Sequence, residues 1–256
     1  MELRLRFNED VQTYDRFRPG YPDALFDAVI SRAGIGPGSR LLEIGIGTGQ
    51  AAQPFLDLGC AVTAVELGER LSAFAAEKFR AYQNFHVVTG DFMQIETDGG
   101  AYDLIYSATA FHWLPAEEAC AKVLQSLRPG GTAALFWNHP FVRRAEDPSN
   151  AASEAVYERL RPSGKGFREF SEADCEPWKT KLVEAGFLDV TAQLFRRTRT
   201  LCTEDYIGLL NTYSDHRALE PGLKTRFETE MRQAVDAAGG QIRIYDTIDL
   251  YLSSKP

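Results

Sequence analysis

The chain has 256 residues, of which 44% are hydrophobic and 25% charged, a composition typical of soluble globular proteins. Its formal net charge of −8 counts against a nucleic acid as the main partner, because binding to phosphate backbones requires clustered lysine and arginine. The N-terminal residues contain no apolar run of signal-peptide length, and no stretch of about eighteen apolar residues occurs. We therefore expect neither export nor a membrane span.

The four cysteines are far apart in the sequence and form no C-x-x-C pair: Cys60, Cys120, Cys175 and Cys202. Cys60 and Cys120 fall in apolar patterns, where a free thiol behaves as a small hydrophobic group. This usage predicts a reduced, cytoplasmic protein without disulfides. No metal centre is predicted.

Apolar runs and helical patterns alternate through the first 137 residues. After an N-terminal arm, apolar residues from Leu25 to Ala33 recur at helical spacing, and "GIGPG" ends that helix. The predicted elements then follow in order: a strand at "LLEIGI", a helix over about 50–58, a strand at "CAVTAV", a helix over about 71–82, strands at "FHVV" and "YDLIYS", a helix over about 116–127 that stops at "RPGG", and a strand at "TAALFW".

The alternation breaks at Asn138. Residues 138–170 are polar and charged, with a helix predicted at about 152–160. A helix through Trp178 and a strand from about Leu188 follow, and then helices near 206–213 and 223–235. In the last segment, "QIRIYDTIDLYL", apolar and polar residues alternate, which predicts a strand with one less-buried face.

Short apolar strands that alternate with amphipathic helices are typical of a parallel sheet covered on both faces. We therefore predict an α/β, Rossmann-like fold with a mostly parallel seven-stranded sheet and helices on both faces. The arm and a core would occupy 1–137, and the rest of the same sheet would occupy 138–256. Insertions at about 138–170 and 203–238 would form a small helical cap.

The most informative stretch is "LLEIGIGTGQ", in which Glu43 precedes Gly45, Gly47 and Gly49 at the end of the first strand. Glycines there permit positive φ and let the backbone approach a ligand closely. The spacing is not the dinucleotide fingerprint, because the third glycine or alanine of that pattern falls on Gln50. An acid ahead of the glycines suits a cationic amino-acid group better than a pyrophosphate. The core is thus predicted to bind a cofactor.

Two further acids end the next two strands. Glu66 can accept both ribose hydroxyls there, and Asp91 can accept from an adenine amino group, with Phe92 alongside. Each feature alone has a structural alternative: Gly49 packs a helix on a strand, Glu66 caps a helix, and Asp91 forms a turn. Three acids at successive strand ends together favour a nucleoside that carries an amino acid.

The segment over about 40–137 resembles the class I S-adenosylmethionine-dependent methyltransferases, in particular their type 11 group. The glycine loop, Glu66, "GDF", "YDLIYSATAFHW" and "LRPGGTAALFW" stand in the order and approximate spacing of that family. The N-terminal "YDRFRPGYP" also resembles the small-molecule branch that includes trans-aconitate methyltransferases. The core resemblance covers about two-fifths of the chain and implies S-adenosylmethionine as the cofactor.

The resemblance also implies where each part of the cofactor is bound. The methionine end is expected at Glu43, Gly45, Ile46 and Gly47, the ribose at Glu66, the adenine at Leu67, Asp91 and Phe92, and the sulfonium near the backbone of Ser107 and Ala108.

Methyl transfer from a sulfonium needs alignment and exclusion of water, and a base only where the acceptor must lose a proton. His112 follows the fourth strand and is a candidate for proton transfer or acceptor contact, with orientation of its loop as the alternative. Tyr14 of the arm would lie near the methyl group in the branch that it resembles. The alternative is that Pro19 and Pro22 only set the entry into the first helix.

Further candidates for contact with the acceptor are Arg18 in the arm, Trp113, Trp137 and His139 at strand ends, and Tyr213 and His216 in the predicted cap. Trp113 can instead form a wall of the cofactor pocket, and Tyr213 and His216 can belong to a polar helix end. The acidic balance and the cap favour a small-molecule acceptor, with a carboxylic acid as one candidate, over a nucleic acid or a membrane. Oligomeric state stays open.

The sequence leaves two other functions open. A non-catalytic S-adenosylmethionine-binding protein would keep the same motif, because binding and transfer are separable. An NAD(P)-dependent oxidoreductase is disfavoured by Gln50 and by the extra acid, Asp91.

Overall fold

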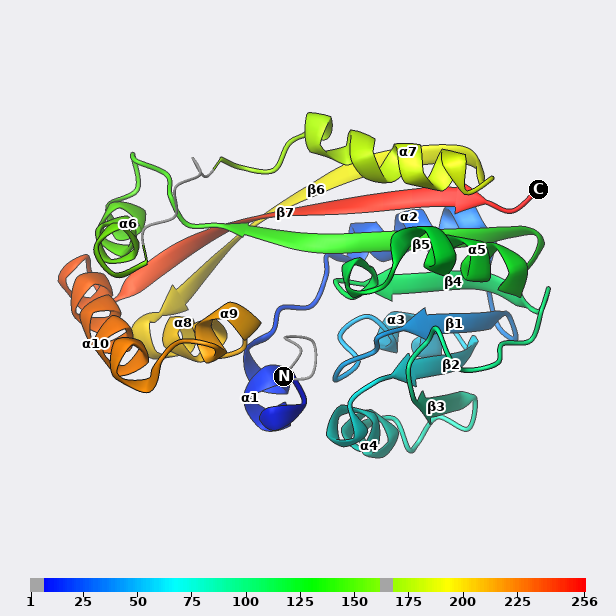
Figure 1. The fold of residues 1–256 in the computed structure, drawn as a ribbon, viewed down its shortest axis with the longest axis horizontal. Helices are drawn as coiled ribbons and strands as arrows, with labels where there is room; N and C mark the ends of the chain where they lie inside the picture. Colours follow the sequence, from blue (N-terminus) through cyan, green and yellow to red (C-terminus); the bar gives the residue numbers. More distant parts are fainter. Residues whose placement is uncertain (1–6, 162–167) are drawn as a thin grey trace. The chain divides into compact units, whose positions relative to one another are not determined.

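The computed structural model describes residues 7–161 and 168–256, so residues 162–167 of the predicted insertion lie outside the described part. The helices are α1 (Val11–Phe17), α2 (Asp23–Ala33), α3 (Gln53–Asp57), α4 (Glu69–Lys78), α5 (Ala116–Ser126), α6 (Pro148–Leu160), α7 (Glu176–Glu184), α8 (Thr203–Leu210), α9 (Ser214–Arg217) and α10 (Pro221–Ala237), with short 3₁₀ turns η2 (Phe111–Trp113) and η3 (Glu172–Cys175). The strands are β1 (Arg40–Ile44), β2 (Ala61–Glu66), β3 (Phe85–Thr89), β4 (Tyr102–Ala108), β5 (Leu127–Phe141), β6 (Leu188–Cys202) and β7 (Gln241–Ser254) (Figure 1).

The strands form one seven-stranded sheet in the order β3-β2-β1-β4-β5-β7-β6. The pairs β1·β2, β2·β3, β1·β4 and β4·β5 are parallel, whereas the arrow of β7 points opposite to those of β1 and β4 (Figure 1). The predicted Rossmann-like, mostly parallel sheet is thereby confirmed. The strand order reverses between β1 and β4, and ligands of such folds bind outside the carboxyl ends of the strands at that reversal.

Several predicted elements have different bounds: α4 and α8 both end about three or four residues earlier than predicted, and β5 and α3 begin at other residues. β5 begins at Leu127, so "RPGG" lies within the strand and does not separate α5 from it; a register shift against β4 at Tyr102 to Leu104 accommodates this irregular start. α3 begins at Gln53, three residues later than predicted, because residues 47–52 form turns.

The predicted less-buried face of the last strand is correct only for its first half. Exposure alternates from Gln241 to Ile244, but every residue from Asp246 to Ser254 is buried. The physical reason is that helices cover both faces of the sheet along this half of β7: Ile248 and Leu250 pack in one core with α2, and α5 and α7 lie on the other face (Figure 1).

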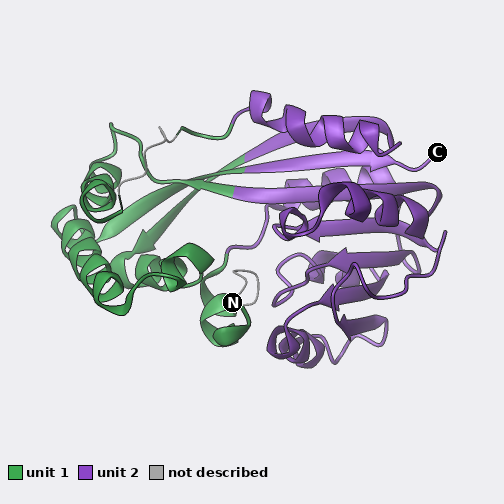
Figure 2. Ribbon diagram, viewed as in Figure 1, with its two compact units in different colours: residues 1–18, 139–170, 196–247 green, residues 19–138, 171–195, 248–256 purple. Residues whose placement is uncertain are grey.

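The chain divides into two compact units (Figure 2). Unit 1 comprises 1–18, 139–170 and 196–247, and unit 2 comprises 19–138, 171–195 and 248–256. Apart from Asn138, both segments predicted as cap insertions fall in unit 1. The core of unit 1 is built mainly from α6, α8 and α10, with Tyr206, Phe227 and Met231 among its buried side chains.

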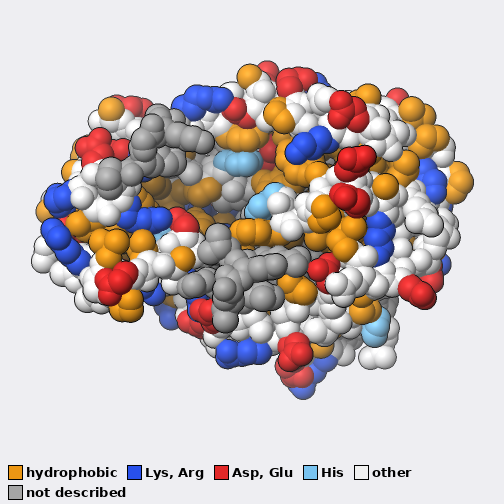
Figure 3. Space-filling model, in the orientation of Figure 1, with side chains coloured by type: hydrophobic (Ala, Val, Ile, Leu, Met, Phe, Trp, Pro, Cys, Tyr) orange, Lys and Arg blue, Asp and Glu red, His pale blue; other side chains and the backbone are white. Residues whose placement is uncertain are grey.

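Charged side chains of both signs are interspersed on the face in Figure 3 and do not gather there into one basic surface. The longest of the described helices, α10, has 17 residues. Across the described ranges, no helix is both long and apolar enough to cross a bilayer, which takes about 20 residues.

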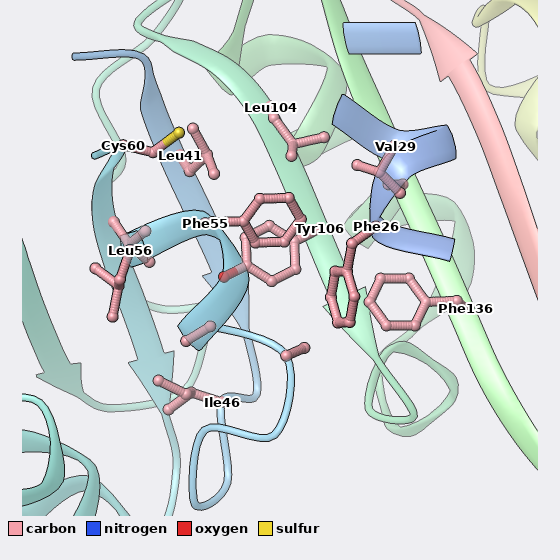
Figure 4. Packing of buried hydrophobic residues seen from close by; sticks show 14 of the residues in the cluster. Phe26, Val29, Leu41, Ile46, Phe55, Leu56, Cys60, Leu104, Tyr106 and Phe136 are labelled. Atoms are coloured by element: carbon pink, nitrogen blue, oxygen red, sulfur yellow. The ribbon is translucent and has the colours of Figure 1, made fainter. Parts of the chain in front are cut away.

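The core of unit 2 lies between the sheet and helices α2, α3 and α4 (Figure 4). Phe55 of α3 packs on Tyr106 of β4 with ring centroids 4.7 Å apart, and Phe26 of α2 packs against Phe55 at 5.6 Å. Helices α5 and α7 cover the other face (Figure 1). This packing holds the carboxyl ends of β1, β2 and β4 in place, where the site is built.

Gly49 is expected to be the glycine whose replacement costs the fold most. Its φ is +85°, and a Cβ there would lie 2.2 Å from Cε2 of Phe79. We expect Gly49→Ala to lower the free energy of unfolding by about 2–5 kcal/mol, from left-handed strain plus overpacking. Gly34→Ala is the control, because Gly34 has φ +60° but open space around it and should cost only about 1 kcal/mol. Chemical denaturation measures both, and equal losses would contradict the role of Phe79.

Candidate functional site

The glycine loop follows β1 and turns back toward the end of β4. Gly45, Gly47 and Gly49 all have positive φ, of +75°, +59° and +85°. The Gly45 N–H donates to the carbonyl of Val65 at 2.8 Å, and a Cβ on Gly45 would lie 2.5 Å from Cβ of Ala110. Only glycine fits this combination of left-handed backbone and close approach.

Glu66 joins this loop to the start of α4. Its Oε2 accepts from the Gly47 N–H at 2.8 Å, and its Oε1 accepts from the Gly68 N–H at 2.9 Å. The side chain is buried, and burial raises the pKa of Glu66 although these backbone N–H groups oppose the shift. The carboxylate thus accepts from backbone N–H groups at the start of α4, as the capping alternative predicts, and the lone pairs that these donors leave can accept from ligand hydroxyls.

Glu43 lies in β1 beside Tyr106 of β4, its partner in register. The Tyr106 hydroxyl donates to Oε2 of Glu43 at 2.9 Å. Glu43 is 1% exposed, and burial raises the pKa of its carboxyl to about 8; the Tyr106 bond opposes that shift, and the charge of Glu66 adds to it. Without a cationic ligand, burial thus favours the protonated form of Glu43.

Two buried acids with raised pKa values beside a close-approach glycine loop fit a ligand that brings positive charge and hydroxyl donors. S-adenosylmethionine has both, in its ammonium and sulfonium groups and its ribose. The glycine loop and the two acids are therefore compatible with this cofactor. Glu43 and the loop would hold the amino-acid end, and Glu66 the ribose.

Asp91 forms the turn after β3. Its Oδ1 accepts from the Met93 N–H at 2.9 Å, as expected if Asp91 serves to form a turn. Phe92 is buried, with the Lys122 ammonium 5.0 Å from its ring centroid. Adenine binding by both residues, and by half-buried Leu67, stays a prediction.

The other predicted cofactor contacts are largely buried. The side chain of Ile46 packs in the unit 2 core, and its carbonyl accepts from the Gly49 N–H at 2.9 Å. Ser107 donates its hydroxyl to the carbonyl of Ile44 at 2.8 Å. Ala108 is half-buried at the end of β4. Their part in cofactor binding stays a prediction.

His112 lies on the turn η2 and is exposed, and its Nδ1 is 2.9 Å from the indole nitrogen of Trp137. Trp113 packs beside His112 with ring centroids 4.8 Å apart. The structure thus brings Trp137, predicted at the end of the fifth strand, together with His112 and Trp113, predicted after the fourth.

The remaining candidates belong to unit 1. The Arg18 guanidinium donates to the carbonyl of Thr212 at 2.8 Å and lies over the rings of Tyr14, at 5.2 Å, and Tyr213, at 4.6 Å. Arg18, Tyr14 and Tyr213 therefore form one cluster, although the arm and Tyr213, the residue before α9, are far apart in sequence. Their contact with an acceptor stays a prediction.

His216 and His139 are separate within the same unit. His216 is buried, its Nε2 is 3.2 Å from the Tyr157 hydroxyl, and burial lowers the pKa of the ring to about 4. His139 stacks on Phe170 at 3.8 Å. A cavity of about 260 Å³ in unit 1 is lined by Tyr157, Tyr206, Tyr213, His216, Arg143 and Arg161 among others.

Four residues next to the candidates are not predicted by the sequence. Thr109 has φ +56°, unusual for a β-branched residue, and its hydroxyl is 2.7 Å from that of Tyr21. Trp178 stacks on Trp137 at 5.0 Å, and Asp249 accepts from the Trp137 backbone N–H at 3.0 Å. An acid between Ile248 and Leu250 was the one available signal, because a charge in an apolar strand needs a partner.

Comparison with known proteins identifies the family. A family profile described as a methyltransferase domain matches residues 41–131. An uncharacterized methyltransferase of Geobacillus kaustophilus is 30% identical over 200 residues, which cover 75% of this chain and 85% of that protein. An uncharacterized methyltransferase of Schizosaccharomyces pombe is 25% identical over 236 residues, which cover 90% of this chain and 86% of that protein.

Solved structures agree at the level of the fold. Phosphoethanolamine N-methyltransferase 2 of Haemonchus contortus, in complex with S-adenosyl-L-methionine, matches with a TM-score of 0.60 and 15% identity, over 100% of this chain and 60% of that one. The glycine loop, the buried acids at the strand ends and the long match to the Geobacillus protein all lead to one conclusion. The chain belongs to the class I S-adenosylmethionine-dependent methyltransferases, whose methyl donor is S-adenosylmethionine.

Proposed function

We propose that this methyltransferase methylates a small-molecule carboxylic acid. The cofactor supplies an electrophilic methyl group on a sulfonium, and a carboxylate oxygen attacks it without losing a proton. The chain's own residues then have two tasks, which are to bind the two molecules in line and to exclude water. The observation that carries the proposal is that His112, the candidate nearest the predicted sulfonium contacts, already has its Nδ1 engaged by Trp137.

Other observations support a small acceptor. Charges of both signs are interspersed on the face in Figure 3, which offers no basic track for a nucleic acid. Unit 1 holds arginines close to aromatic rings, with Arg18 over Tyr14 and Tyr213. Such pairs of guanidinium and aromatic groups suit a flat acid.

A transfer assay tests the proposal. The purified protein is incubated with methyl-labelled S-adenosylmethionine and panels of carboxylic acids, phenols and amines. Label is expected in a base-labile methyl ester. Label only in an ether or an amine would contradict the carboxylic acid, and tight cofactor binding with no transfer to any panel would favour a non-catalytic binding protein.

His112 variants test the absence of a general base. With a carboxylate acceptor, both variants should retain most of kcat, and His112→Gln should keep a lower KM for the acceptor than His112→Phe, because the glutamine amide can still donate a hydrogen bond. Both variants are compared by kcat and KM for the acceptor. Equal losses of about a hundredfold or more in kcat in the two variants would instead indicate general-base work.

A further inference from the structure

The contact between Trp137 and His112 has a defined donor. The indole nitrogen of Trp137 and Nδ1 of His112 are 2.9 Å apart. An indole N–H can only donate. Nδ1 of His112 therefore accepts, and it does so with the lone pair of an unprotonated nitrogen.

The tautomer of the imidazole follows from this contact. A neutral ring carries one proton, and since Nδ1 holds a lone pair, that proton is on Nε2. A proton on Nδ1 would set two N–H groups against each other at hydrogen-bond distance and break the contact. Whatever Nε2 of His112 meets, the ring presents a donor to it.

Trp137 is the fixed member of the pair. It is buried, its ring stacks on Trp178 with an interplanar angle of 24°, and its edge meets Tyr251 at 5.8 Å. Its backbone N–H is held by Asp249, whose other oxygen accepts from the Tyr251 hydroxyl at 2.9 Å. His112 is exposed on a three-residue turn. The tryptophan therefore orients the histidine, and not the reverse.

We propose that Trp137 is a positioning residue that holds His112 as the neutral Nε2–H tautomer, so that His112 serves the acceptor as a hydrogen-bond donor and not as a general base. The inference rests on the proposed function for its consequence, since a donor suits an acceptor that already carries an anionic oxygen. Phenols and enolisable carbons need a base on the same loop, and this ring offers no lone pair while the indole contact persists.

Nitrogen NMR tests the tautomer without any acceptor. In ¹⁵N-labelled protein at neutral pH, the His112 signals are those that His112→Gln removes from the spectrum of the four histidines. In the wild type, Nδ1 is expected to resonate as an unprotonated nitrogen and Nε2 as a protonated one. In Trp137→Phe, which keeps the aromatic ring and removes the N–H, both signals should move toward values averaged over two tautomers.

Trp178→Phe is the matched control. It alters the stack around Trp137 but leaves the indole N–H, so the His112 tautomer should be retained. The signals of the other three histidines report that each variant is folded. A wild-type ring with its proton on Nδ1, or a Trp137→Phe spectrum equal to that of the wild type, would overturn the proposal.

Kinetics then separate the donor from a base. Once an acceptor is known, His112→Phe should raise its KM about tenfold or more and lower kcat much less, because a donor to an existing anion binds the ground state at least as strongly as the transition state, in which that charge is being neutralised. A hundredfold loss confined to kcat would overturn the donor role. The NMR result stands apart from the acceptor, so failure of the carboxylic acid and failure of the tautomer are distinguishable.

Discussion

Replacing Glu66 by alanine is expected to weaken binding of S-adenosylhomocysteine about 10- to 150-fold. The ribose hydroxyls would lose a charged acceptor worth about 1.5–3 kcal/mol. The same change leaves the N–H groups of Gly47 and Gly68 without the carboxylate that accepts from them, so the free energy of unfolding should also fall, by about 2–4 kcal/mol. Titration calorimetry and denaturation measure the two effects.

A double-mutant cycle, in which a modified ligand takes the place of the second mutation, separates the contact of Glu66 with the ribose from its contacts with Gly47 and Gly68. A 2′,3′-dideoxy analogue should bind the wild type weakly and bind Glu66→Ala no worse than the parent ligand does, because the lost contact is shared. Glu69→Ala, an exposed acid in the first turn of α4, is the control and should change neither affinity nor stability appreciably. Independent, additive losses for variant and analogue would contradict the placement of the ribose.

Cofactor affinity is expected to rise with pH between about 6 and 8, more steeply in the wild type than in Glu43→Gln. Burial raises the pKa of Glu43 to about 8, so at lower pH the ligand's ammonium must displace a proton from it. One proton released on binding corresponds to at most about tenfold in affinity per pH unit. The ligand's own amino group titrates alike with both proteins, so the difference in slope isolates Glu43.

Stability without cofactor should show the opposite trend. The pKa of Glu43 is raised from its ordinary value of 4.5 to about 8 in the folded state, so between these pH values the folded state binds more protons than the unfolded state. The contribution of Glu43 to stability is therefore fully present below pH 4.5 and is lost as pH rises through about 8. Glu43→Gln should flatten this decline. Tyr106→Phe removes the hydrogen bond that opposes the shift and should move the window to higher pH. Identical pH profiles for wild type and Glu43→Gln would falsify the assignment.

Much of unit 2 is predictable from the sequence because its signals are local. The apolar runs that become β1, β2, β3 and β4 appear at the expected positions. By contrast, the pattern of β7 suggests one less-buried face, and only the helices that pack on both faces of the sheet show that its second half is covered on both. Neighbours in a sheet are non-local, and periodicity along one strand does not report them.

The candidate site divides in the same way. "LLEIGIGTGQ" places Glu43 and the glycines without any structure, since strand-end acids and positive-φ glycines are read directly from the chain. Glu66 is a candidate ribose acceptor from the sequence. Its second role, accepting from the backbone N–H groups of Gly47 and Gly68, appears only in the structure.

The sequence by itself determined the fold class, the family and the cofactor, because these depend on motifs whose residues are close together in the chain. Only the tertiary structure decided the protonation chemistry. The neutral form of Glu43 requires burial beside Tyr106, 63 residues away, and the tautomer of His112 requires an indole 25 residues away on β5. Desolvation and hydrogen-bond direction are set by which groups meet in space, and no local pattern encodes those meetings.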